Sequence, residues 1–372
     1  MRLVWATVQR VRRADGGIEE LDVATDDDRP LSVAINYPAL AGACAVGERV
    51  LLNTTAVELG LGTGGKHFVV ARLGEGSGIA LDAPSGGHIM KLRYTPLQAD
   101  VISVESPESP EHDLMQSADD LLGMPVVCCG LHSQVPLVAA AIKQRDPECR
   151  VVYCMTDSAS LALPLSDVIR ASVTSGLVDA TISCGQAFGG DYEAVNLQSG
   201  LLAARHVAGA QVAIAAVGPG VVGTATPFGH GGVAQGEAVN AAAALGGTPI
   251  PVLRISFADA RDRHRVVSHH TLCALTRIAL APALIAVPAL PALQAEQVEA
   301  SLADQNVWEL HRRAPMRQAV SAPPDLRGVE VMTMGRGPAD DPAFFAAAFA
   351  AGAAAAEVAS GIAETPRGQS PS

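Results

Sequence analysis

Aromatic and charged side chains are both scarce in this chain of 372 residues. Phe, Trp and Tyr make up 3% of the sequence and Asp, Glu, Lys and Arg make up 17%, whereas hydrophobic residues make up 49%. Because few rings are available to fill the interior, Ala, Val, Leu and Ile must pack helices and sheets closely together. The mean hydropathy of +0.25 also leads us to expect a homo-oligomer, in which a second copy covers apolar surface.

The chain also lacks the excess of basic residues that nucleic-acid-binding proteins use. Its formal net charge is −12 at pH 7, and binding to phosphate backbones depends on clustered Lys and Arg. We therefore expect no nucleic-acid partner. The start of the chain lacks the apolar run of a signal peptide, because basic residues recur from Arg2 to Arg13.

Neither a disulfide framework nor a zinc ribbon is indicated by the cysteines. The chain has seven of them, an odd number, and no two have the C-x-x-C spacing. This pattern favours a reducing, cytoplasmic location. The uncharged stretches at residues 207–236 and 278–295 are interrupted by Gly and Pro, so they predict buried strands and loops, and we expect no membrane partner.

Two regions with different patterns are present. Residues 1–104 contain short apolar alternations separated by turn residues, with strands expected at 3–8, 50–53 and 68–73. They predict a small all-β barrel or sandwich with a structural or dimerising role. The acidic segment at 105–122, which contains Pro and Ser, resembles a linker.

Residues 123–362 alternate seven apolar runs with amphipathic segments, which predicts an α/β domain with a mostly parallel sheet and helices on both faces. An incomplete β/α barrel also fits the pattern, although we favour the open sheet. The tail at 363–372 is expected to be disordered. The predicted strands are residues 126–129, 150–155, 180–184, 211–217, 250–255, 284–287 and 329–333.

The segment 254–271 carries four arginines, three histidines and two aspartates in a chain otherwise rich in Ala, Val, Gly and Leu. Ser268 is a good N-cap for a following amphipathic helix, so His269 and His270 should occupy the first turn of that helix. The helix N-terminus favours neutral imidazoles and attracts anions. This segment is the first candidate for chemistry.

Polar and glycine residues follow nearly every predicted strand, and parallel strands bring such positions to one edge of the sheet. His132, Asp157 and Asp191, together with His269 or His270, are the candidate acids, bases or metal ligands, although aspartates at strand ends also cap helices. The sequence does not identify the cofactor, and a divalent metal is possible. The candidate ligand-binding residues are Ser133, Ser158, Gly189, Gly190, Gly218, Gly220, Gly223, Thr224, Arg254, Ser256, Asp259 and Arg336.

The segment 218–224 resembles a phosphate-binding loop in composition only. It lacks the Gly-Lys-Ser/Thr ending of a Walker loop, and Pro219 stands inside the tight turn of a Gly-x-Gly-x-x-Gly spacing. A tight turn against another segment of backbone is the commoner explanation. For phosphate recognition, Arg254 and Arg336 are favoured because they stand nearest to strand ends.

Several motifs together resemble a bacterial family described as domain of unknown function 3866. They are Leu52-Asn-Thr-Thr-Ala-Val-Glu-Leu-Gly-Leu-Gly-Thr-Gly-Gly65, Gly87-His-Ile-Met-Lys-Leu-Arg-Tyr-Thr-Pro-Leu-Gln98, Phe188-Gly-Gly-Asp-Tyr-Glu-Ala-Val-Asn196, Val217-Gly-Pro-Gly-Val-Val-Gly-Thr224 and Ser268-His-His-Thr271. The resemblance spans nearly the whole chain and implies no activity, substrate or catalytic residue.

Taken together, these features predict an enzyme, a hydrolase or group transferase, that acts on a small anionic or phosphorylated metabolite at the strand-end crevice. The alternative is a non-catalytic sensor or assembly module in which the α/β domain binds a nucleotide or metabolite.

Overall fold

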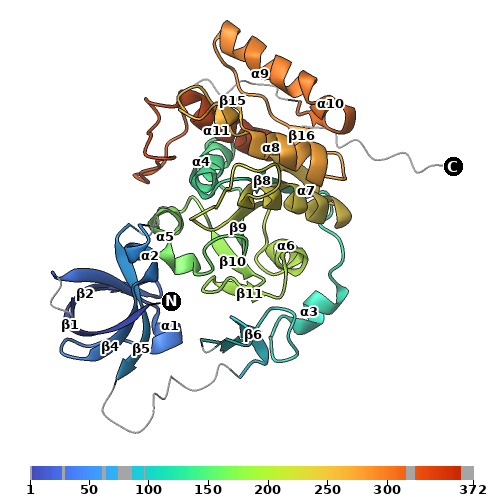
Figure 1. Ribbon diagram of the computed structural model, residues 1–372. Coiled ribbons are helices and arrows are strands. Elements are labelled where there is room, and N and C mark those ends of the chain that lie inside the picture. Colours follow the sequence, from blue (N-terminus) through green and yellow to red (C-terminus); the bar gives the residue numbers. More distant parts are fainter. Residues whose placement is uncertain are drawn as a thin grey trace. The chain divides into compact units, whose positions relative to one another are not determined.

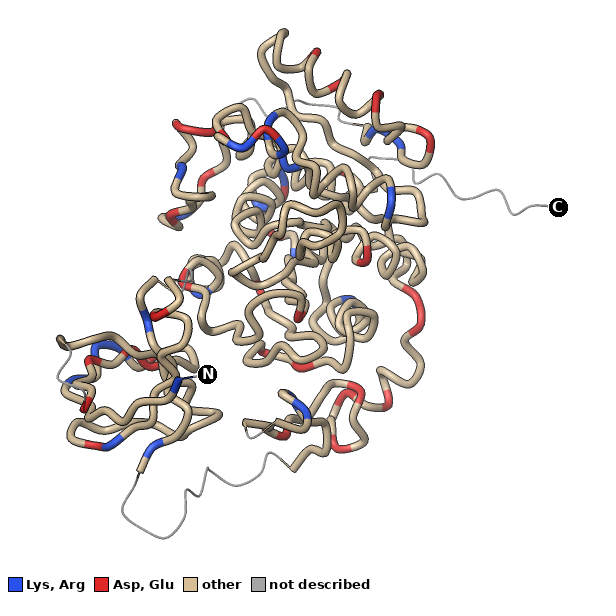
Figure 2. The backbone as a smooth tube through the Cα atoms, viewed as in Figure 1, with Lys and Arg blue, Asp and Glu red and all other residues tan. Residues whose placement is uncertain are grey.

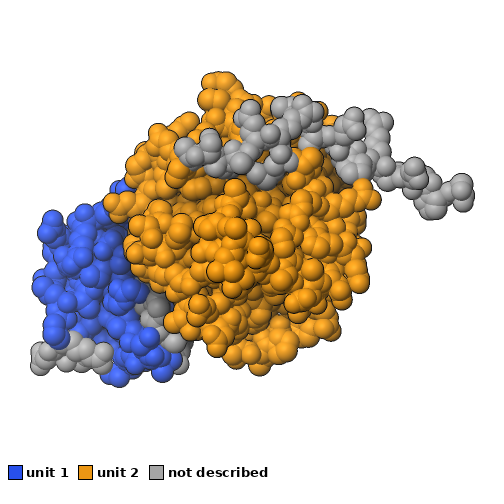
Figure 3. All heavy atoms as spheres, turned by 90° about the horizontal axis from the view of Figure 1, so that it is seen from above, with its two compact units in different colours: residues 1–102 blue, residues 103–372 orange. Residues whose placement is uncertain are grey.

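The computed structural model describes residues 2–26, 30–60, 64–73, 86–95, 97–315 and 323–361. The chain divides into two compact units, residues 1–102 and 103–372, which Figure 3 shows in different colours. The expected disordered tail at 363–372 lies outside the described residues.

The first unit contains the predicted small barrel. Its strands close in the order β1-β2-β3-β5-β4, and neighbours are antiparallel except for the parallel pair β3 and β5. Alternate residues such as Leu21 and Val23, or Val50 and Leu52, point into the barrel core. Its elements are β1 (Leu3–Asp15), β2 (Ile18–Thr25), β3 (Ser32–Asn36), α1 (Pro38–Ala41), β4 (Arg49–Asn53), α2 (Thr55–Glu58), β5 (Lys66–Leu73), β6 (Ile89–Lys91) and β7 (Ala99–Val101).

The second unit is built on an open, six-stranded sheet in the order β11-β10-β9-β12-β8-β13, and all its pairs are parallel. The open sheet that we favoured is therefore confirmed over the barrel. Five of its strands overlap predicted ones, and β11 was not predicted. The strands are β8 (Pro125–Cys129), β9 (Val151–Thr156), β10 (Ala180–Cys184), β11 (Tyr192–Ala194), β12 (Val212–Val217) and β13 (Thr248–Pro251).

Helices cover both faces of this sheet (Figure 1). Val127 and Cys129 of β8 face α4 (Val135–Arg145), α5 (Asp167–Thr174) and α11 (Pro342–Ala359). Val126 and Cys128, which alternate with them, face α6 (Leu197–His206) and α7 (Ala234–Ala244). With few aromatic side chains available, the helices pack closely through small residues. A Cβ on Gly352 of α11 would stand 2.4 Å from the Val138 carbonyl oxygen of α4, so only glycine fits there.

Helix α11 is long and apolar enough to cross a membrane by length and composition. However, 78% of its apolar window is buried inside the protein, where it packs against α4. A core helix of an α/β domain has the same properties. The two uncharged stretches noted in the sequence contain the strands β12 and β16 (Leu284–Ile285) with loops, as predicted.

The segment at 105–122 is not a linker. It belongs to the second unit and contains α3 (His112–Ser117). The Glu105 carboxylate accepts a hydrogen bond from the Val195 amide at 2.8 Å, and the Leu121 side chain is fully buried. Its Pro and Ser residues form turns on the sheet domain, which the acidic composition did not reveal.

The last three predicted strands take different forms from those expected. The run 250–255 leaves the sheet after Pro251, and β14 (Ile255–Ser256) then pairs antiparallel with β15 (Val266–Val267). The run 284–287 forms β16, which pairs with β17 (Arg312–Arg313) outside the main sheet. The run 329–333 forms no strand and makes a single bridge between Thr333 and Arg336. The remaining helical elements are η1 (His132–Gln134), η2 (Leu163–Leu165), η3 (Gly231–Val233), η4 (Asp262–His264), α8 (His269–Cys273), η5 (Ala274–Ile278), α9 (Ala292–Asp304) and α10 (Val307–Leu310).

The strand order creates a switch point between the central neighbours β9 and β12. The helix that follows β9 packs on one face of the sheet and the helix that follows β12 packs on the other. Loops diverge from the carboxyl ends of such strands and leave room for a ligand. In this protein the loop after β9 and the loop after β12 are joined by one hydrogen bond near the strand ends, which the Ser160 amide donates to the Pro219 carbonyl at 3.0 Å.

Candidate functional site

The predicted helix after Ser268 is present and begins as expected. The Ser268 hydroxyl accepts a hydrogen bond from the His270 amide at 3.3 Å, and Ser268 is fully buried. His269 and His270 therefore stand in the first turn of α8. Helix α8 spans five residues and continues directly into the π-helical η5.

A third histidine reaches the same place from the loop that follows β12. That loop turns back on itself through an antiparallel bridge between Gly223 and His230. Small residues make the approach possible, because a Cβ on Gly232 would stand 3.0 Å from the His270 Cβ and 2.9 Å from the His230 Nδ1. His230 is buried, with 4% of its surface exposed.

We call His230, His264, His269 and His270 the histidine cluster. The rings of His230 and His270 are stacked, with centroids 3.8 Å apart. The His264 ring lies 4.8 Å from that of His270 and 5.1 Å from that of His269. One ligand atom each from His230, His269 and His270 lies within 4.8 Å of the other two.

Hydrogen bonds fix part of the protonation pattern of the histidine cluster. The His230 Nε2 lies 3.1 Å from the Pro227 carbonyl oxygen, and a carbonyl only accepts, so Nε2 carries the proton and Nδ1 the lone pair. Among the described residues, this buried His230 Nδ1 and the buried Nε2 of His269 have no hydrogen-bond partner. His264 Nδ1 bonds to the Ser268 hydroxyl at 2.8 Å.

Burial keeps these imidazoles neutral. It lowers the pKa of His264 to about 3, and the neighbouring Arg254 and Arg261 add to the effect. Burial followed by the charge of the other histidines lowers the pKa of His270, and burial also lowers the pKa values of His230 and His269. Neutral imidazoles each have one donor and one acceptor, as acid-base chemistry and metal binding both require.

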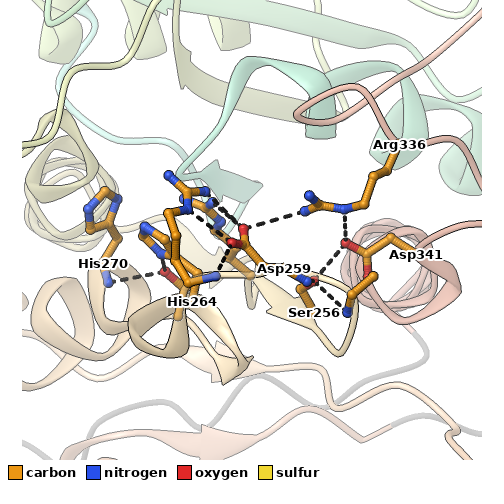
Figure 4. A network of polar contacts seen from close by, with 10 residues as sticks. Ser256, Asp259, His264, His270, Arg336 and Asp341 are labelled. Atoms are coloured by element: carbon orange, nitrogen blue, oxygen red, sulfur yellow. Dashed lines mark hydrogen bonds and ion pairs between the residues drawn. The ribbon is translucent and has the colours of Figure 1, made fainter.

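A network of arginines and aspartates adjoins the cluster, and we call it the arginine network (Figure 4). At its centre Asp259, 3% exposed, accepts two hydrogen bonds from Arg261 at 2.9 and 2.8 Å. Arg254 and Arg336 approach the same carboxylate at 3.6 and 3.4 Å. The Arg261 hydrogen bonds hold the pKa of Asp259 well below its usual range, whereas burial lowers the pKa of Arg254 to about 10.

Arg336 is held in the network by a tight turn. Thr333 and Arg336 exchange two backbone hydrogen bonds of 2.9 Å across Met334 and Gly335, whose φ angles are +49° and +77°. This is the geometry of a two-residue hairpin turn, in which glycine is favoured. The Arg336 Nε then donates to Asp341 at 3.1 Å, and Asp341 also accepts from the Ser256 hydroxyl at 2.7 Å.

Four residues predicted to bind ligand, Arg254, Ser256, Asp259 and Arg336, are thus gathered, but they bind one another. Three guanidinium groups face two carboxylates in this network, so one positive charge is in excess. Exposed Arg263 and Arg265 add two positive charges, and exposed Asp262 next to Arg263 subtracts one. Figure 2 shows this charged segment against a sheet domain in which Lys, Arg, Asp and Glu are otherwise sparse.

His132 lies at the same edge of the sheet, in a separate group. Its Nε2 bonds to the Ser166 hydroxyl, the N-cap of α5, at 2.5 Å, and its ring lies 6.5 Å from that of Tyr153. Burial lowers the pKa of His132 to about 4. Ser133 follows it in η1 and is half-buried. The partners of His132, Ser166 and Tyr153, lie outside the histidine cluster.

Asp157 and Ser158 are exposed in the loop after β9, beside the loop that carries His230. The Asp157 carboxylate accepts from the Gln186 amide at 2.9 Å, and the Ser158 carbonyl oxygen would stand 3.5 Å from a Cβ on Gly231. Asp157 therefore orders the loop after β10.

The segment 218–224 forms tight turns that pack against other segments of backbone, as in the commoner of the two explanations. A Cβ on Gly218 would stand 2.6 Å from the Ser160 carbonyl oxygen, Gly220 has a φ of +88°, and Gly223 approaches the His270 ring. The Thr224 hydroxyl bonds to the Gly229 carbonyl at 2.9 Å. Gly220, Gly223 and Thr224 thus shape the loop that carries His230. Gly218 allows this loop to approach the loop after β9.

Asp191 does not join the histidines. Strand β11 runs parallel to β10, so the loop returns to the amino half of β10, where Asp191 accepts from the Thr181 amide and hydroxyl at 2.8 and 2.9 Å. The Gly189 amide donates to Glu193 and the Gly190 amide to the Ser183 hydroxyl, both at 2.7 Å. These three residues hold the edge strand in place.

The sequence profile described as Protein of unknown function (DUF3866) matches residues 33–352. The chain belongs to this family. The matched range contains both the histidine cluster and the arginine network. No curated protein and no solved structure matches the chain.

For this DUF3866 protein, neither His230 nor His264 was predicted from the sequence as a site residue. His264 stood inside the segment 254–271 without a predicted role. His230 stands in Gly229-His-Gly-Gly232 after a predicted strand, which is a signal that could have found it. A histidine flanked by glycines in a strand-end loop is free to approach another segment closely.

Proposed function

We propose that the protein is an enzyme, a hydrolase or group transferase, that acts on a small anionic or phosphorylated metabolite at the carboxyl edge of the parallel sheet. The observation that supports this most strongly is the histidine cluster of neutral imidazoles beside the arginine network with its excess positive charge. In a chain with a net charge of −12, a local positive region beside acid-base groups favours an anionic substrate.

Neutral imidazoles match the proton transfers of such reactions. A water oxygen, or a hydroxyl oxygen of an acceptor, forms a bond to the phosphorus or carbonyl carbon, and its proton passes to the lone pair of one imidazole. The bond to the leaving oxygen breaks, and that oxygen takes up the proton that the imidazole had accepted. His269 and His270 are the candidates for these roles, and the excess charge of the network stabilises the anion.

The test uses the full-length protein with p-nitrophenyl phosphate and bis(p-nitrophenyl) phosphate, whose hydrolysis releases a coloured phenolate. We expect turnover by the wild-type protein and a roughly hundredfold or larger loss in His269→Ala or His270→Ala. His206→Ala is the control, because His206 is on α6 and bonds to the Asp120 carbonyl. Absence of turnover in the wild type, or undiminished turnover in both variants, contradicts the proposal.

A further inference from the structure

His230, His269 and His270 bring three nitrogen atoms together from two separate segments. Their candidate ligand atoms lie within 4.8 Å of one another. A zinc ion bound by imidazoles at 2.0–2.1 Å needs its ligands about 3.4 Å apart. Because an imidazole binds a metal in the plane of its ring, closing the set around one ion also requires the stacked rings of His230 and His270 to tilt out of their parallel arrangement.

Two of these nitrogens are left without hydrogen bonds where burial makes that costly. The His230 Nε2 is committed to the Pro227 carbonyl, so its Nδ1 offers a lone pair. Within the described residues, that atom and the His269 Nε2 are buried without a hydrogen-bond partner. An unsatisfied buried polar atom costs about 1–3 kcal/mol, and a ligand in the cluster would remove this cost.

The chemistry of the donors selects the class of ion. Imidazoles suit Zn²⁺, Cu²⁺, Ni²⁺ and Fe²⁺, whereas Mg²⁺ and Ca²⁺ prefer oxygen ligands. The group whose atoms converge contains no carboxylate, because Asp259 is engaged by arginines. Three protein ligands with a remaining open position are typical of catalytic zinc sites.

We propose that His230, His269 and His270 bind a single transition-metal ion of the Zn²⁺ class. This inference deepens the proposed function by naming the cofactor of the same site. It rests on that function for what the ion would do, but not for whether the ion binds. As ligands, His269 and His270 would hold an ion that activates the attacking water, in place of accepting its proton themselves. The His230 hydrogen bond to Pro227 fixes the ring so that Nδ1 is the ligand, as outer hydrogen bonds do in metal sites.

The nearby arginines weaken the binding of any cation to these imidazoles. A proton gains a bond to one nitrogen only, whereas a metal ion gains three, so the cluster still favours the metal over the proton. Charge balance then calls for an anion at the open position, which matches an anionic substrate.

Zinc binding is measured by calorimetric titration of metal-stripped, full-length protein with ZnCl₂, in the absence of any substrate. We expect one ion per chain in the wild type. His230→Gln is the sharp variant, because the Gln amide nitrogen can keep the bond to Pro227 while the Nδ1 ligand is lost. It should bind zinc roughly a hundredfold or more weakly, whereas His206→Gln on α6 should bind as the wild type does.

Cobalt provides a second measurement that does not depend on the folding of a variant. Co²⁺ bound to the wild-type protein should give the visible bands of nitrogen ligation without the strong near-ultraviolet band of thiolate ligation. Failure of the wild type to bind at micromolar free metal, a thiolate band, or unchanged affinity in both His230→Gln and His270→Gln overturns the proposal. Turnover without metal binding would leave the proposed function standing, and metal binding without turnover would overturn only that function.

Discussion

The imidazole rings of His230 and His270 stack face to face, with centroids 3.8 Å apart and an interplanar angle of 5°. The two residues come from the loop after β12 and from the first turn of α8. Burial lowers the pKa values of both histidines, which favours the neutral form of both stacked rings.

Replacing Gly232 by Ala should break this stack. The new Cβ would stand 2.9 Å from the His230 Nδ1 and 3.0 Å from the His270 Cβ, so one ring must move. We expect a loss of roughly 1–3 kcal/mol in the free energy of unfolding and the loss of ring-current shifts in the histidine NMR signals. Gly337→Ala is the control, since its nearest contact is 3.7 Å; unchanged histidine signals in Gly232→Ala would show that the rings do not depend on this glycine.

Asp259 is the residue on which the arginine network depends. Asp259→Asn should lower the free energy of unfolding by roughly 3 kcal/mol, because it leaves the buried Arg254 without its carboxylate. Asp262→Asn alters an exposed carboxylate in the same segment and should change stability by less than about 0.5 kcal/mol. Urea unfolding of both variants is the measurement, and equal effects would mean that Arg254 does not need Asp259.

The sheet could be predicted from the sequence because each central strand is a continuous apolar run that is buried on both faces. Strands β8, β9, β10 and β12 were found in this way, and residues 180–184 match β10 in full. Strand β11 was missed because it has three residues, which are too few to show the alternation of apolar and polar residues that marks a strand. The run 329–333 has strand composition, but no neighbouring strand pairs with it along its length.

The candidate site was predicted in part for a related reason. Strand direction placed His269, His270 and the loop 218–224 at one edge, and those residues do meet. Direction alone cannot reveal that a loop doubles back, which is why Asp191 lies beside Thr181 at the amino half of β10. Nor could it reveal that Arg336 faces Asp259, because these two residues are 77 positions apart in the sequence.

The stability of the protein should fall with pH below neutrality, in part through His132. Burial lowers the pKa of His132 to about 4 in the folded state, against about 6.5 in the unfolded chain. Between these values the unfolded state binds more protons, so stability decreases as pH falls from about 6.5 to about 4 and is flat below. The lost contribution is at most about 3.5 kcal/mol, at about 1.4 kcal/mol for each of roughly 2.5 pKa units.

His132→Gln isolates this contribution, because the Gln amide can keep a hydrogen bond to Ser166 without titrating. The free energy of unfolding is measured by urea titration at several pH values from 7 to 4.5. Other buried histidines contribute to the wild-type slope, so the comparison is the difference between wild type and variant. The two curves should converge as pH falls, and parallel curves over the whole range would contradict the assignment.

Ser268 links the helix cap to the histidine cluster, since its hydroxyl accepts from the His270 amide and bonds to the His264 Nδ1. Ser268→Ala should cost about 1 kcal/mol for the lost cap, with a further cost from the unpaired His264 nitrogen. A double-mutant cycle with His264→Ala separates the two effects by thermal and urea unfolding. We expect a coupling energy above about 0.5 kcal/mol; additive single effects would mean that the hydroxyl caps α8 without positioning His264.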